Sequence, residues 1–148
     1  GDTPSCSLVE TFKEIDEIRP GNFIFYDIQQ LLIGSCVQEQ IAMCVLCPVV
    51  AVFPDRDEIV IYGGAVHLSK DSALFNNERI FGFPAYWDGV KRGCIIPDSF
   101  VKSLSQEHGV ISMPETEISK IKPGDVIAIL PAHSCLTASE MKHNYSYT

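Results

Sequence analysis

The sequence predicts a mainly β protein, a closed or sandwiched antiparallel β domain. Three observations support this class: short runs rich in aromatic and β-branched residues, Gly- and Pro-containing turns between them, and no helical periodicity alternating with those runs. A chain of 148 residues with 46% hydrophobic residues can bury a sizeable core as one domain. Because the chain contains no internal repeat or linker, we expect a single domain over residues 1–148.

The elements of the first half follow from composition. A Ser cap with a Glu three residues later predicts a short helix over residues 7–19. Residues 22–28 are rich in aromatic and β-branched side chains, which predicts a strand. The apolar run 41–53 and the segment 58–62 flank a turn at 54–57, so we expect them to pair as antiparallel strands.

The second half is predicted to contain shorter strands. Residues 71–93 hold many turn formers and no sustained periodicity, which indicates a loop region with short strands at best. Residues 100–105 and 110–113 are predicted as strand pieces on either side of a polar turn at 106–109. A tight turn, Lys-Pro-Gly-Asp, precedes a predicted strand over residues 126–130.

Charge and composition exclude several classes of partner. With 11 Lys and Arg against 19 Asp and Glu, the net charge of −8 argues against nucleic acid and anionic membrane surfaces. The longest apolar run, residues 41–53, is shorter than the roughly 20 residues that cross a bilayer. Six cysteines are too few for a disulfide scaffold, so we expect reduced thiols and a cytoplasmic location. The start, without Met or a signal peptide, indicates a processed or excised piece.

His133 and Cys135 form the strongest candidate site. They lie two residues apart after a predicted strand, and in extended chain such side chains point to the same side. An imidazole and a thiolate together favour zinc, and two protein ligands leave positions open for water or substrate. The alternative, which the spacing alone favours, is a strand end with a buried thiol and a hydrogen-bonded His.

Two other clusters carry weaker signals. Glu107 and His108, beside a Gly, pair a carboxylate with an imidazole and are candidates for acid–base chemistry, although composition alone favours a polar turn between two strands. Cys44 and Cys47 are three residues apart, which in a strand places them on opposite faces, so we interpret both as core residues.

Four segments together resemble a known family. They are, in chain order, residues 17–27 (EIRPGNFIFYD), 62–71 (YGGAVHLSKD), 103–109 (SLSQEHG) and 131–138 (PAHSCLTA). The chain resembles the C-terminal β domain of the D-threonine aldolase and D-serine dehydratase family, which comprises alanine-racemase-type, fold type III pyridoxal-phosphate enzymes. The resemblance covers nearly the whole chain in the correct order.

The resemblance implies a larger, barrel-plus-β-domain enzyme. An N-terminal α/β barrel would hold pyridoxal phosphate on a lysine that this chain lacks, so the fragment alone is expected to be inactive. Residues 1–6 are similar to the segment that leaves the barrel, which implies that Gly1, Asp2 and Thr3 lie near the cofactor phosphate.

The resemblance also implies a reaction and a metal. It identifies His133 and Cys135 as ligands of a divalent ion, with zinc favoured over manganese or magnesium, and Glu107 and His108 as neighbouring catalytic residues. The expected substrate is a small D-β-hydroxy amino acid, which is either dehydrated or cleaved by an aldolase reaction. The expected assembly is a homodimer. The alternative is a noncatalytic β module for dimerisation of an amino-acid racemase-like enzyme.

Overall fold

The computed structural model describes residues 2–144 and 146, and this part of the chain is mainly β. It contains a seven-stranded sheet in the order β6-β5-β9-β1-β2-β8-β7 and a separate β3-β4 hairpin. Every strand pair is antiparallel, as the sequence predicted. No helix among the described residues has the length and apolar character needed to cross a membrane.

The strands are β1 (Val45–Phe53), β2 (Glu58–Tyr62), β3 (Ala73–Phe75), β4 (Glu78–Ile80), β5 (Gly82–Trp87), β6 (Arg92–Ile95), β7 (Phe100–Leu104), β8 (His108–Ser112) and β9 (Val126–Pro131). The α-helices are α1 (Thr3–Leu8), α2 (Ile28–Ile33), α3 (Ala65–Leu68), α4 (Glu115–Ile118) and α5 (Ser134–Glu140). Short 3-10 turns occupy η1 (Gln38–Gln40) and η2 (Pro54–Arg56).

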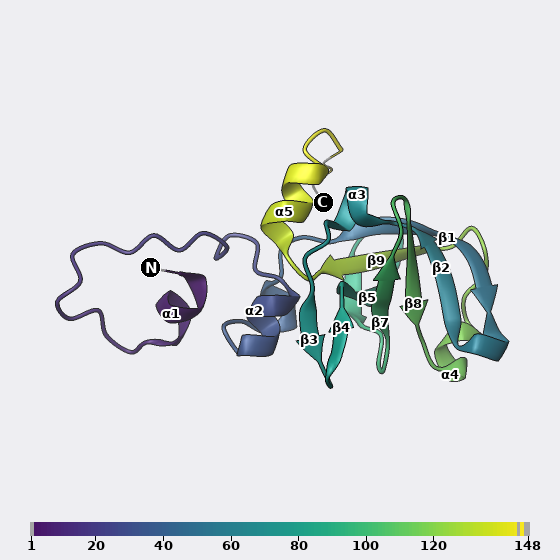
Figure 1. Ribbon diagram of the computed structural model, residues 1–148, viewed down its shortest axis with the longest axis horizontal. Coiled ribbons are helices and arrows are strands. Elements are labelled where there is room, and N and C mark those ends of the chain that lie inside the picture. The colour runs from purple at the N-terminus through teal and green to yellow at the C-terminus, as the bar shows by residue number, and fades with distance from the viewer. Residues whose placement is uncertain (1, 145, 147–148) are drawn as a thin grey trace.

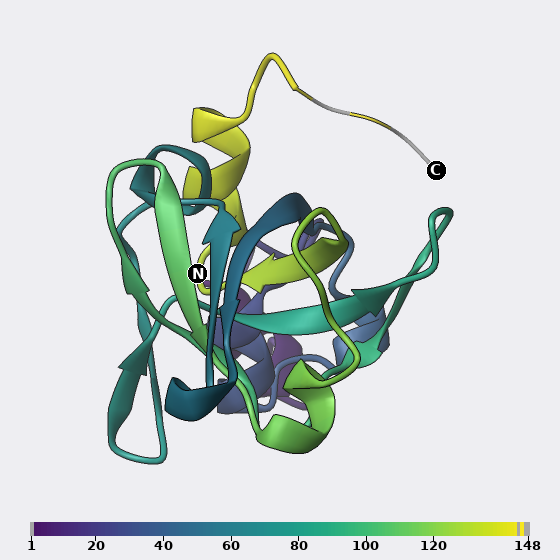
Figure 2. The same ribbon diagram turned by 90° about the vertical axis from the view of Figure 1, so that its right-hand side faces the viewer.

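The large sheet curls on itself without closing into a fully paired barrel (Figures 1 and 2). Its order has two ends, β6 and β7, yet β7 contacts both β4 and β5. Phe81, which precedes β5, links the two sides: its N–H donates to the carbonyl of Val101 at 2.9 Å, and its carbonyl accepts from Ala132 N–H at 2.9 Å. Pairing of β5 with β9 places the end of β9 beside Phe81, and the curl of the sheet brings β7 to the other side of the same residue.

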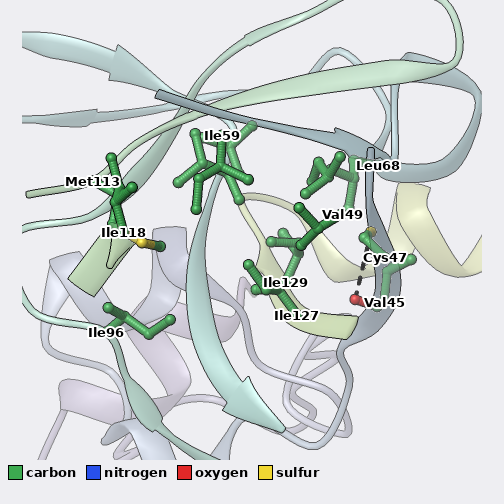
Figure 3. Packing of buried hydrophobic residues seen from close by; sticks show 13 residues of the cluster. Val45, Cys47, Val49, Ile59, Leu68, Ile96, Met113, Ile118, Ile127 and Ile129 are labelled. Atoms are coloured by element: carbon green, nitrogen blue, oxygen red, sulfur yellow. Dashed lines mark hydrogen bonds between the residues drawn. The ribbon is translucent and has the colours of Figure 1, made fainter. Parts of the chain in front are cut away.

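Strand β9 lies inside the fold because both of its faces are buried. Ile127 and Ile129 pack into a cluster with alternate residues of β1, including Cys47, as Figure 3 shows. Ala128 and Leu130 face a second cluster that includes residues of α2 and β5. A strand buried on both faces has little freedom to shift, so the chain that follows it starts from a well-determined position.

Two expectations near the N-terminus are wrong. The helix expected over residues 7–19 lies earlier in the chain, at Thr3–Leu8 (α1). Asp2 caps it by accepting the Ser5 N–H at 2.8 Å, and a Pro lies in its first turn. The strand expected over residues 22–28 is a turn followed by the start of α2, and Tyr26 has a positive φ of 48°. The aromatic and β-branched composition was misleading because hydrogen bonds to Asp27 determine this segment.

The later elements agree better with the prediction. The turn at 122–125 and the strand after it are confirmed, as is the antiparallel pair on either side of the turn at 54–57. The region 71–93 has more strand than expected, since β5 alone spans six residues. The polar turn at 106–109 is shorter than expected because His108 and Gly109 already belong to β8.

Gly64 allows the β7–β8 turn to pack against the start of α3. A Cβ at this position would lie 2.5 Å from the backbone atoms Gln106 O, Glu107 C and His108 N. These are backbone atoms, which cannot move aside as a flexible side chain can.

We therefore expect Gly64→Ala to lower the free energy of unfolding by about 1–3 kcal/mol, the usual cost of overpacking. Gly21→Ala is the matched control, because nothing lies within 4 Å of a Cβ at Gly21. Urea unfolding followed by the fluorescence of the single Trp measures both variants. Equal stability of the two would contradict the close approach at Gly64.

Candidate functional site

The candidate site lies where β9 ends and α5 begins. His133 is the N-cap of α5, with φ −137° and ψ 104°, and Cys135 lies in the first turn of the helix. The expectation that residues 133–135 are extended is therefore wrong, because the chain turns into a helix at Ser134. The environment of the two side chains depends on the segments that pack against this turn.

Asp27 anchors the backbone between the two candidate ligands. Its side chain is fully buried, and its carboxylate accepts the Ser134 N–H at 3.0 Å and the Gln30 N–H at 2.9 Å. It also accepts a short hydrogen bond from Asn22 Nδ2. The Ser134 hydroxyl in turn donates to the Tyr26 carbonyl at 2.6 Å. One carboxylate thus joins residues 22–30 to the start of α5.

His133 has a carboxylate partner from another part of the chain. Its Nδ1 lies 2.6 Å from Oδ2 of Asp71, which follows α3. Helices α3 and α5 are held together here, since the Thr137 hydroxyl donates to the Leu68 carbonyl at 3.0 Å. Nε2 of His133 is the ring nitrogen that this contact leaves available.

Cys135 lies beside the Asp27 network. Its thiol donates to Oδ1 of Asn22 at 3.4 Å. Burial, and secondly the negative charge of Asp27, raise the pKa of the Cys135 thiol above its ordinary value. The backbone N–H of Asn22 donates to the Thr3 hydroxyl at 2.8 Å, so α1 is connected to the same network.

The donor set fits a zinc-type metal ion. It combines an imidazole nitrogen, a thiol sulfur and a carboxylate that accepts from the other imidazole nitrogen, an arrangement common around protein-bound zinc. No group of three or more His, Cys, Asp or Glu side chains within residues 2–144 and 146 is arranged to hold an ion. A metal held by His133 and Cys135 would therefore need further ligands from water, substrate or other protein segments.

A hollow of about 630 Å³ is lined in part by Asp71, the partner of His133. Helix α3, helix α5 and the β7–β8 turn form its walls. Its polar lining includes Ser69, Lys70, Asp71, Ser105, Gln106 and Glu140. The hollow can take a small polar molecule, and Asp71 is the lining residue that connects it to His133.

Glu107 and His108 lie at the β7–β8 turn. The His108 ring packs edge-on against Tyr62, with centroids 5.7 Å apart, and the Glu107 carbonyl accepts the Gly63 N–H at 3.0 Å. Tyr62 also contacts His67 at a centroid distance of 5.0 Å. The catalytic role expected for Glu107 and His108 stays a prediction.

Of the three residues expected near the cofactor, Gly1 lies outside the described residues. Asp2 caps α1, and the hydrogen bond from Ser5 N–H lowers the pKa of its carboxyl. Thr3 is buried and accepts from Asn22. Their role in cofactor binding stays a prediction.

Sequence reasoning missed three residues of the site, namely Asn22, Asp27 and Asp71. Asp27 precedes Gln30 by three residues, and this spacing is a helix N-terminus signal that could have identified it as a cap. Neither Asn22 nor Asp71 has such a local signal, because the contacts that connect them to Cys135 and His133 span 113 and 62 positions.

Comparisons with known proteins identify the family. Residues 42–147 match the family model described as "Putative serine dehydratase domain". The chain is 32% identical over 147 residues to the D-serine dehydratase of Dictyostelium discoideum, with 94% of this chain and 36% of that protein covered. It is 27% identical over 145 residues to the D-threo-3-hydroxyaspartate dehydratase of Delftia sp. (strain HT23), with 95% and 38% covered.

Solved structures share the fold. An alanine racemase-like protein from Idiomarina loihiensis has a TM-score of 0.82 at 30% identity, covering 94% of this chain and 37% of that chain. Structures of the D-threo-3-hydroxyaspartate dehydratase include a His-to-Ala mutant and a Cys-to-Ala mutant in the metal-free form, at positions two residues apart. The chain spans little more than a third of the length of the two dehydratases that it matches.

Asp27→Ala should destabilise the protein strongly. It leaves two backbone N–H groups and the Asn22 amide without their acceptor, and each buried unpaired group costs about 1–3 kcal/mol. We expect the free energy of unfolding to fall by about 3 kcal/mol or more, measured by urea unfolding. Asp16→Ala, at an exposed position, serves as the control and should change little.

Thiol alkylation should follow burial and pKa. At pH 8 we expect iodoacetamide to label exposed Cys94 first, Cys135 slowly, and Cys47 not at all, because burial raises the pKa of Cys47 to about 12. Since the pKa of Cys135 is raised, its thiolate fraction and labelling rate should keep increasing above about pH 8.5. Peptide mass spectrometry measures each rate. Labelling of Cys135 as fast as Cys94 at pH 8 would contradict the described environment.

Proposed function

The chain belongs to the serine dehydratase domain family, and on that premise we propose that it is the metal-bearing domain of a pyridoxal-phosphate-dependent lyase acting on D-β-hydroxy amino acids. The remaining part of the longer protein would be an N-terminal barrel that carries the cofactor lysine. The short span of this chain relative to the two dehydratases is consistent with such a second domain.

The proposal rests on the residue types and the spacing of His133 and Cys135. The two mutated positions of the related D-threo-3-hydroxyaspartate dehydratase have the same residue types and the same spacing, and its Cys-to-Ala mutant is in the metal-free form. This supports a direct role of both residues as metal ligands. Both relatives compared above are dehydratases, which favours dehydration over aldol cleavage.

The residues of this chain would bind and orient the metal. When bound, the metal would polarise the β-hydroxyl of the substrate while pyridoxal phosphate accepts electron density. His133 would offer Nε2, because Nδ1 faces Asp71. Cys135 would offer its sulfur after losing the proton that it shares with Asn22. Asp27 would keep both in place through Ser134.

The hollow lined by Asp71, the partner of His133, is the proposed place for the substrate. Its lining offers both donors and acceptors, among them Lys70, Gln106 and Glu140, which suits a zwitterionic amino acid. Glu107 and His108 directly follow Ser105 and Gln106, which form one wall, and we propose them as acid–base residues. The segment that contains Asp2 and Thr3 is proposed to lie near the cofactor phosphate. The whole enzyme is proposed to be a cytoplasmic homodimer.

We expect His133→Ala and Cys135→Ala, each in the full-length enzyme, to lose the bound metal and to lower turnover by about 100-fold or more. The absorbance of pyridoxal phosphate should remain, because the cofactor lysine lies in the other domain. Elemental analysis gives the metal per subunit, and pyruvate release from D-serine gives the dehydratase rate. Cys94→Ala, at an exposed position, is the control and should behave as wild type.

Full metal content and activity in both variants would overturn the metal assignment. The alternative would then apply, a noncatalytic β module for dimerisation. Release of glycine and an aldehyde from D-threonine, with no release of pyruvate from D-serine, would instead identify an aldolase.

A further inference from the structure

The contact between Asp71 and His133 joins residues 62 positions apart in the sequence. Oδ2 of Asp71 lies 2.6 Å from Nδ1 of His133, which is short for a bond between a nitrogen and a carboxylate. The side chains are 45% and 29% exposed, respectively, so the pair lies at the boundary between protein and solvent. Burial alone therefore does not account for this contact.

The carboxylate selects one tautomer of the imidazole. A neutral imidazole has one N–H and one nitrogen with a free lone pair, and an ionised carboxylate can only accept. Nδ1 must therefore carry the proton, which leaves the lone pair on Nε2. A metal ion binds a neutral imidazole only through its lone pair, so the contact prepares Nε2 as the ligand atom.

Asp71 itself is held in place. Ser69, directly after α3, has a positive φ of 65°, and its hydroxyl accepts the Asp71 N–H at 3.2 Å. The hydrogen bond from Thr137 to the Leu68 carbonyl fixes the end of α3 against the helix that His133 caps. The carboxylate and the imidazole are thus positioned by the same helix pair, α3 and α5.

We propose that Asp71 is a positioning residue that fixes His133 in the tautomer with Nε2 free for the metal. This inference rests on the proposed function, because it assumes that His133 is a metal ligand. It assigns different tasks to the two carboxylates of the site. Asp27 holds the backbone at Ser134, whereas Asp71 orients the imidazole ring and determines which of its nitrogens is available.

Asp71→Asn in the full-length enzyme tests the proposal. The amide can present either its oxygen or its NH₂ group to Nδ1, so it enforces neither tautomer. We expect the affinity for Zn²⁺ to fall by about 10–100-fold, the usual effect of losing such a carboxylate partner. Competition with a chromophoric chelator measures the affinity without reference to activity. Asp55→Asn, in the exposed η2 turn, removes the same charge elsewhere and should leave the affinity unchanged.

His133→Ala, measured in parallel, separates the two ideas. If His133→Ala loses Zn²⁺ and Asp71→Asn binds it as tightly as wild type, the role of Asp71 is wrong and the proposed function stands. If His133→Ala binds Zn²⁺ as tightly as wild type, the metal assignment fails, and the proposal for Asp71 fails with it.

The tautomer can also be observed directly in the metal-free wild-type enzyme, so the test does not depend on a folded variant. With ¹⁵N-labelled histidine at pH 8.5, Nδ1 of His133 should show the chemical shift of a protonated nitrogen and Nε2 that of an unprotonated one. The His133→Ala spectrum assigns the signals. The reverse pattern, with the proton on Nε2, would overturn the proposal.

Discussion

The buried carboxylate of Asp27 is the constraint on which the candidate site depends. An ionised group inside a protein is costly unless donors surround it, and here the Ser134 N–H, the Gln30 N–H and the Asn22 amide supply them. These donors come from α5, α2 and the segment before α2. The hydrogen bonds to this one carboxylate therefore bring together three parts of the chain, and one of these parts contains both candidate metal ligands.

The sheet determines the position at which α5 begins. Because β9 is buried on both faces, its end is well placed, and α5 starts directly after it. Pairing of β9 with β5 places Ala132 next to Phe81, at the entry of β5. His133 and Cys135 thus follow a strand that is fixed inside the fold.

The two candidate ligands have different surroundings. His133 faces the carboxylate of Asp71, whereas Cys135 faces the amide oxygen of Asn22, and burial together with the negative charge of Asp27 raises the pKa of its thiol. A raised pKa favours the neutral thiol, so a metal bound at Cys135, as we propose, would displace its proton. The relatives named above are much longer than this chain, so the rest of the protein would complete the active site that we propose.

The sequence by itself determined the class of the fold, most of the strands after residue 41 and the turns between them, because these follow from local composition and from Gly and Pro. It also singled out His133 and Cys135, first by residue type and then by resemblance. Only the tertiary structure decided that residues 22–28 are not a strand, that Cys135 lies in a helix, and that Asp27 and Asp71 belong to the site. Asp27 meets Ser134 across 107 positions and Asp71 meets His133 across 62, and local propensity contains no information on contacts of that range.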